Sequence, residues 1–208
     1  MFKLEKLNEL NERKGPGHLF SIVHFYLVLK YLSDERKPIG RYNLGKRLKL
    51  GGGSVRTVIN RLSDENLIRS EGRKGHIITP KGQNVLDQIS KTIIEINPLD
   101  KVGNLTVSKK NVGCQVRDSK DFLNSSLKLR DEAIKVGASG VTTLIYKNQD
   151  FLILGMEEEF DIKNDHKELY EELLNKFKNL ESNDLIIIGT AQSEILAKMG
   201  SLSAIFSQ

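Results

Sequence analysis

The chain has 208 residues, with 32 Lys+Arg against 27 Asp+Glu, and therefore a net charge of +5. Its single cysteine, Cys114, excludes a disulfide framework and a cluster of thiolate metal ligands. No apolar run approaches the length of a membrane span, and the first residues lack the apolar region of a signal peptide. We therefore expect a cytoplasmic protein that does not enter a membrane.

The basic charge is concentrated in the first half of the chain. Residues 1–96 carry 18 Lys+Arg against 10 Asp+Glu, whereas residues 97–208 carry 14 against 17. The window 36–81 alone holds 12 basic and 3 acidic side chains. This asymmetry indicates a polyanion as the partner of the first half, although a solvated basic face would have the same composition.

Helical spacing of apolar residues predicts one helix at about 18–32 and another at about 41–48. A very short strand at Ile39 separates them. The glycines of "GGGSVRTVINRLSDENLI", which begins at Gly51, then raise the question of a phosphate-binding loop. No lysine follows the last glycine as a P-loop requires, and no apolar strand precedes the glycines as a dinucleotide fingerprint requires. We therefore interpret the glycines as a tight turn between two helices, because glycine tolerates positive φ.

The helix after this turn is predicted at 54–65, with Ser54 as its N-cap. Four apolar side chains fall at i, i+3, i+4 and i+7 and predict its buried face: Val55, Val58, Ile59 and Leu62. The side chains left for the outer face are of the types that contact base edges or phosphates: Arg56, Thr57, Asn60 and Arg61.

A β-hairpin and a fourth helix are predicted next. The strands lie at 67–68 and 76–79, and the basic turn at 71–76 carries Arg73 and Lys74. Thr79 and Pro80 provide an N-cap and an N1 proline for a helix at about 81–95. "EINPLDKVGN" reads as a linker, so we expect a first domain at 1–97 and a second at 98–208.

The order of elements over residues 18–95 resembles a winged helix-turn-helix. "SVRTVINRL", "NLI" and "ITPKG" match the recognition helix, the strand after it and the exit of the wing. The resemblance implies a transcriptional regulator that binds double-stranded DNA with its recognition helix in the major groove. It assigns DNA contacts to Arg41, Lys46, Ser54, Arg56, Thr57, Asn60, Arg61, Arg73 and Lys74.

The second half alternates strand and helix signals. Strands are predicted at 112–117, 141–146, 151–154 and 184–189, with helices at 120–136, 165–180 and 193–206. The order β-α-β-β-α-β is the split βαβ pattern of ferredoxin-like folds. We therefore predict an α+β protein, in which the winged helix is followed by a small α/β sandwich with the ferredoxin-like arrangement as one candidate topology.

This half offers no catalytic residues, no metal-ligand spacing and no cofactor motif, so we expect no enzyme activity. Glycines at strand–helix corners suggest either a site for a small effector or close packing. The candidate ligand-binding residues are Gly137, Ser139, Gly140, Thr142, Gly189 and Thr190. We expect the domain to serve in ligand sensing or dimerisation.

"LRDEAIKVGASGVTTLIYKNQDFLILG" and "NDLIIIGTAQSEILAKMGSLSAIF" resemble an archaeal family that pairs an N-terminal winged helix with a C-terminal domain of unknown function. A homodimer is expected, since operators are mostly palindromic. Its seam would be the stripe Val85, Ile89, Ile93 and Ile96, or "LEKLNEL" near the N-terminus. An enzyme with an accessory winged helix and an RNA- or protein-binding adaptor remain as alternatives.

Overall fold

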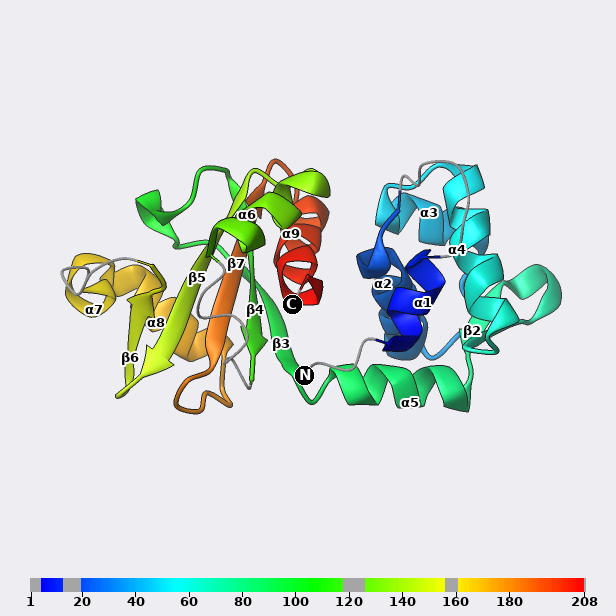
Figure 1. Ribbon diagram of the computed structural model, residues 1–208, viewed down its shortest axis with the longest axis horizontal. Helices are drawn as coiled ribbons and strands as arrows, with labels where there is room; N and C mark the ends of the chain where they lie inside the picture. Colours follow the sequence, from blue (N-terminus) through cyan, green and yellow to red (C-terminus); the bar gives the residue numbers. More distant parts are fainter. Residues whose placement is uncertain (1–4, 13–19, 118–125, 156–160, 208) are drawn as a thin grey trace. The chain divides into compact units, whose positions relative to one another are not determined.

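The computed structural model describes residues 5–12, 20–117, 126–155 and 161–207 (Figure 1). The chain divides between Ser90 and Lys91 into two compact units. The division lies seven residues before the expected boundary at 97/98, because the expected linker is a strand of the second unit.

The first unit is mainly helical and ends in a small hairpin and a helix. Helix α1 packs on α2, and the buried side chains of α2 include nearly every apolar residue between Ile22 and Leu32. The elements are α1 (Glu5–Glu12), α2 (Ile22–Glu35), α3 (Arg41–Leu48), α4 (Gly52–Asp64), β1 (Ile68–Ser70), the 3₁₀ turn η1 (Gly72–Lys74), β2 (His76–Ile78) and α5 (Pro80–Ile89).

The turn between α3 and α4 differs in detail from the prediction. Lys49, with φ of 52°, is the residue in the left-handed conformation, whereas Gly51 has an ordinary φ of −65° and caps α4. The glycines therefore begin the helix and do not make the turn. Ser54 lies inside the first turn of α4, so its predicted role as N-cap was wrong.

The hairpin is the predicted wing, and it is tied to the start of α3. β1 and β2 pair antiparallel with Ile68 opposite Ile78, and Ile39 forms an isolated bridge with His76. Gly75 has a φ of 118°, and a Cβ there would lie 2.4 Å from the backbone of Ile39. Only glycine fits this close approach of two backbones.

Helix α5 begins as predicted but ends at Ile89, six residues early. Thr79 accepts a hydrogen bond from the Gly82 backbone N–H at 3.1 Å, which confirms the N-cap. The predicted continuation is wrong because the β-branched residues after Ser90 form strand β3, which pairs with β4 from the second unit.

The second unit is a five-stranded antiparallel sheet in the order β3-β4-β7-β5-β6, with helices on both faces (Figure 1). The prediction for 120–136 is confirmed from residue 126 on, and residues 118–125 lie outside the described ranges. The elements are β3 (Ile93–Leu99), the 3₁₀ turn η2 (Gly103–Leu105), β4 (Lys110–Val116), α6 (Ser126–Lys135), β5 (Gly140–Lys147), β6 (Asp150–Ile153), α7 (Ile162–Asp165), α8 (Lys167–Lys176), β7 (Leu185–Ala191) and α9 (Glu194–Phe206).

Two cores lie on opposite faces of this sheet. Leu173 and Phe177 of the α8 side pack with Ile186 and Ile188 of β7 on one face. On the other face, α9 packs on β7 and β4, and α6 packs on α9. The predicted α+β class is confirmed, and the predicted strands and helices follow β3 in the predicted order. The four-stranded ferredoxin-like sheet is wrong, because β3 adds a fifth strand and helices cover both faces.

None of the helices in the described ranges is long and apolar enough to cross a membrane.

Two glycines in the first turns of helices have opposite steric surroundings, and they make a matched pair of variants. A Cβ on Gly82 would lie 2.1 Å from the Leu67 carbonyl oxygen, whereas nothing lies within 4 Å of a Cβ on Gly53. We expect Gly82→Ala to lower the free energy of unfolding by about 1–3 kcal/mol through overpacking. Gly53→Ala should raise it by about 0.4–1 kcal/mol. Urea denaturation measures both, and equal effects of the two substitutions would contradict the packing of α5 on Leu67.

Acid should weaken the fold through His24. The His24 side chain is 6% exposed, and its Nδ1 accepts a hydrogen bond from the Ser21 backbone N–H at 2.9 Å. Burial lowers the pKa of His24 from 6.5 to about 4. Because the unfolded chain binds the proton more tightly, stability is lost as the pH falls from about 6.5 to 4, by about 3 kcal/mol in all.

His24→Gln keeps an acceptor but does not titrate, so this variant should lose less stability between pH 7 and pH 4.5 than the wild type. Urea denaturation at the two pH values gives the comparison, in which carboxylates contribute equally to both proteins. An identical loss in both would show that His24 is not the acid-sensitive group.

Candidate nucleic-acid interface

Helix α4 presents a polar face opposite its buried one. Val55, Val58, Ile59 and Leu62 are all at most 4% exposed, as the spacing predicts. The exposed positions follow the same helical period: Gly53, Arg56, Asn60 and Asp64. Thr57 is half-buried, and its hydroxyl donates to the Gly53 carbonyl oxygen at 3.2 Å. Arg56 and Asn60 thus lie on the surface as predicted, and Ser54 is half-buried at its edge.

Arg61 was predicted on this face, and the prediction was wrong. Arg61 is 8% exposed, and its Nη1 donates to the Leu10 carbonyl oxygen at 2.7 Å. The guanidinium also lies 5.3 Å from the centre of the Phe20 ring. The last carbonyls of a helix lack partners within that helix, so the cation satisfies the end of α1. A polar side chain at this helical position could not be distinguished from a DNA contact before the place of α1 was known.

Cations and an exposed aromatic ring lie on α3, beside α4. Arg41 and Lys46 are exposed as predicted. Tyr42 is 82% exposed, and the sequence reasoning missed it, although an aromatic residue next to arginine at a helix start is a usable signal. The residues of this region line a groove of about 510 Å³: Arg41, Tyr42, Gly45, Lys46, Lys49, Leu50, Gly51, Gly52 and Val55.

Not every cation of α3 is available to a partner. Arg47 forms an ion pair with Glu35 at 2.6 Å and lies 5.5 Å from the centre of the Tyr31 ring. Its place is therefore to hold α3 against α2. An exposed pair of this kind contributes little stability by itself, but it removes the guanidinium from the interface.

The wing adds two further cations. Arg73 and Lys74 are exposed in η1, between the two strands. Arg69, on β1, forms an exposed ion pair with Glu71 at 3.2 Å. The first unit as a whole has 17 Lys+Arg against 9 Asp+Glu over residues 1–90, so its surface field attracts a polyanion.

The three glycines at the start of α4 are not required by the fold. Gly51, Gly52 and Gly53 are exposed, none has a positive φ, and nothing lies within 4 Å of a Cβ on any of them. Glycine in a helix is less favourable than alanine by roughly 1 kcal/mol. Their absence of side chains leaves this end of α4 open to close approach by another molecule.

The glycine corner of the second unit is brought together as predicted, but its polar groups are paired within the chain. Thr142 donates to the Leu105 carbonyl oxygen at 2.8 Å, and Thr190 accepts a hydrogen bond from the Ser108 backbone N–H at 3.0 Å. The Ser139 hydroxyl accepts a hydrogen bond from Ser108, and its backbone N–H donates to Thr190.

The glycines of this corner serve packing and a helix end. Gly189 donates to the Ser201 hydroxyl at 2.8 Å, and a Cβ there would lie 2.2 Å from the Ala197 carbonyl oxygen. Gly137 ends α6 with a φ of 88°, and Gly140 is buried at the start of β5. Close packing, the second of the two explanations, accounts for Gly189, whereas a Cβ on Gly140 would make only ordinary contacts at 3.8 Å or more. An effector site here stays a prediction.

The cysteine side chain of the second unit is buried and unreactive. Burial raises the pKa of the Cys114 thiol to about 12, so it stays protonated at neutral pH. Within the described residues, no group of three or more His, Cys, Asp or Glu side chains is placed to hold a metal ion.

Both predicted dimer seams are used inside the chain. Ile93 and Ile96 belong to β3 and not to the helix that carries Val85 and Ile89, so the stripe does not exist. The other seam fails as well, because Leu7 and Leu10 of α1 are 0% exposed. The expected homodimer therefore stays a prediction without an identified interface.

The first unit has a winged-helix-like fold. Helices α2, α3 and α4 are followed by the hairpin wing, and α4 presents the polar face. Residues 27–84 match the family "PH0730-like, N-terminal domain", and residues 107–207 match "Domain of unknown function (DUF4443)". The chain is therefore similar to a PH0730-like N-terminal domain in its first part and to DUF4443 in its second.

A solved structure agrees with this assignment. The hypothetical protein PH0730 from Pyrococcus horikoshii OT3 is 28% identical, with a TM-score of 0.68, over 90% of this chain and 92% of that chain. The expected resemblance to an archaeal protein with a winged-helix-like N-terminus is confirmed at this level. A search of curated proteins found no match.

Two arginines of α4 test the distinction between fold and surface. Arg61→Ala should lower the free energy of unfolding by about 1.5–3 kcal/mol, because it removes a buried charged donor from the Leu10 carbonyl. Arg56→Ala, five residues earlier and exposed, should change it by less than about 0.5 kcal/mol. Thermal and urea unfolding of both variants provide the measurement. Equal stability of the two variants would contradict the buried hydrogen bond between Arg61 and Leu10.

Proposed function

We propose that this protein binds double-stranded DNA through α4 and the wing, and that it acts as a transcriptional regulator. The observation that carries the proposal is the polar face of α4. Arg56 and Asn60 are exposed on it, while the opposite face is packed into the core. A helix presented in this way fits the major groove, where base edges are distinguished by hydrogen bonds.

The two exposed polar side chains have defined tasks in this proposal. Arg56 would contact guanine and Asn60 adenine, the bases whose edges match their donors and acceptors. Thr57 retains acceptor capacity beside them, although its hydroxyl already donates to Gly53. Gly53 lies on the same face, and its lack of a side chain leaves room for a close approach to the DNA.

Phosphate contacts would come from both sides of α4. Arg41 and Lys46 are exposed on α3, and Arg73 and Lys74 are exposed on the wing. Contacts of this kind fix the position of the protein on the duplex but carry no sequence information. Tyr42 is added to this set, because its hydroxyl and ring are almost fully exposed beside Arg41.

The second unit has a different role in the proposal. Residues 91–208 carry 15 Lys+Arg against 18 Asp+Glu, so their net charge does not favour a second DNA contact. We assign this unit to ligand sensing or to pairing of two chains on a symmetric operator. An effector that prefers one arrangement of the protein would change DNA affinity by roughly 5–150-fold.

Two substitutions separate phosphate contact from base contact. Arg73→Ala should weaken binding to every duplex alike and reduce the slope of log affinity against log salt by about 1. Asn60→Ala should relax the preference at one base pair, where a good contact discriminates by about 1–3 kcal/mol. Selection from a random duplex pool supplies the preferred site, and fluorescence anisotropy at several salt concentrations measures both effects.

Lys147→Ala is the charge-matched control, since Lys147 is exposed in the second unit. It should leave both the affinity and the salt slope unchanged. A selection that yields no preferred duplex would contradict sequence-specific binding. Equal affinity for an RNA hairpin or single-stranded DNA at the same salt would favour the adaptor alternative instead.

A further inference from the structure

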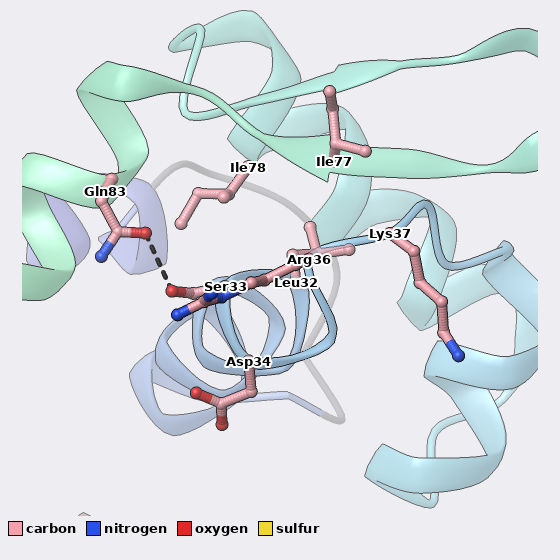
Figure 2. A pocket seen from close by; sticks show the side chains of 8 residues that line it. All are labelled: Leu32, Ser33, Asp34, Arg36, Lys37, Ile77, Ile78 and Gln83. Atoms are coloured by element: carbon pink, nitrogen blue, oxygen red, sulfur yellow. Dashed lines mark hydrogen bonds between the residues drawn. The ribbon is translucent and has the colours of Figure 1, made fainter.

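A pocket of about 560 Å³ lies within the first unit, between the end of α2, strand β2 and the start of α5 (Figure 2). Its volume is within the range of about 300–1,000 Å³ that is usual for small-molecule sites. The lining residues are Leu32, Ser33, Asp34, Arg36, Lys37, Ile77, Ile78 and Gln83. None of these residues belongs to the DNA-binding set proposed above.

The inner surface of the pocket is apolar. Leu32 is buried, and Ile77 and Ile78 are half-buried on β2. The bridge between Ile39 and His76 is isolated, so the backbone pairing does not continue along β2 to Ile77 and Ile78.

Most polar groups around this surface already have partners. Ser33 donates to Gln83 at 2.8 Å, and the Gln83 amide nitrogen donates to Asp87. Asp34 pairs with Lys30, and Lys37 forms an ion pair with Glu35 at 3.2 Å. The hydrogen bond between Ser33 and Gln83 joins α2 to α5, whereas the other three interactions lie within one helix or beside its end.

Arg36 is different from its neighbours. It is exposed, and its guanidinium has no ion pair or hydrogen bond with any residue in the described ranges. Its backbone, with φ of 52° and ψ of 20°, is in the left-handed conformation in which helices commonly end, because Arg36 is the C-cap of α2. The reason to consider a binding role is the exposed guanidinium at the rim of the pocket.

We propose that this pocket binds a small organic monocarboxylate with an apolar body. The apolar part would lie on Leu32 and Ile78, whose side chain points toward α2 (Figure 2), and the carboxylate would take the planar donor pair of Arg36. A carboxylate with an apolar body is favoured over inorganic phosphate, which has no apolar part to place on Leu32 and Ile78. The site goes beyond DNA binding and does not depend on it.

The test uses the full chain with ¹³C-methyl-labelled isoleucine, observed by NMR during titration with phenylacetate and, separately, with neutral phenylacetamide. The Ile78 methyl signals are assigned with Ile78→Val. Phenylacetate should shift these signals with a Kd on the order of 10 mM or tighter, as expected of a ligand of its size. Phenylacetamide should bind about tenfold more weakly, because it lacks the charge-assisted hydrogen bonds.

Arg36→Asn is the decisive variant, since asparagine tolerates the left-handed conformation and the fold is not disturbed. It should reduce the preference for phenylacetate over phenylacetamide to about one, whereas the charge-matched Lys147→Asn should leave it unchanged. Inorganic phosphate should not shift the Ile78 signals. Unmoved Ile78 signals in wild-type protein at the solubility limit of phenylacetate, or an undiminished preference in Arg36→Asn, would overturn the proposal.

Discussion

Two sets of contacts fix the orientation of helix α4: its apolar stripe packs into the core, and Arg61 bonds to α1. The surface of the first unit depends on this orientation. Val58 and Leu62 are 0% exposed in the core, so the apolar stripe fixes which side of the helix turns inward. Arg61 then joins the flank of α4 to the last carbonyls of α1. Because these two contacts fix the rotation of the helix, Arg56 and Asn60 lie on its solvent-exposed side. The polar face is thus a consequence of packing, and its chemistry is what suggests DNA.

The wing depends on a second close contact, between the backbones of Gly75 and Ile39. Strand β2 therefore joins three parts of the unit: the start of α3 through Ile39, the basic tip through Gly75, and the pocket surface at Ile77 and Ile78. A ligand bound on Ile78 would contact the same short strand that carries the wing.

In the second unit, hydrogen bonds between buried polar groups fix a helix and a loop on the sheet. Ser201 accepts from Gly189 and donates to Val112, which fixes α9 on the sheet. On β4, the buried Gln115 donates to Asp184 at 2.7 Å, and Arg117 adds an ion pair to the same carboxylate. Buried polar groups need such partners, so this network secures the loop before β7 and is not by itself a sign of catalysis.

The sequence by itself determined the elements whose signals are local. The spacing of Val55, Val58, Ile59 and Leu62 determined the buried face of α4, and Thr79 with Pro80 determined where α5 begins, because helix period and N-cap chemistry act within a few residues. The exposed site residues Arg56, Asn60, Arg73 and Lys74 follow from the same periodicity and from the turn between two strands.

Only the tertiary structure decided the rest, since it depends on residues far apart in the sequence. Arg61 is buried because Leu10, 51 positions away, offers an unpaired carbonyl. Residues 93–99 are a strand because β4 pairs with them, although their apolar stripe also fits a helix. The corner at Gly189 is filled because α9 returns over it, and the pocket beside Arg36 exists because α2, β2 and α5 meet there. Local patterns specify elements and their inward faces, but long-range packing decides which polar groups remain free to bind a partner.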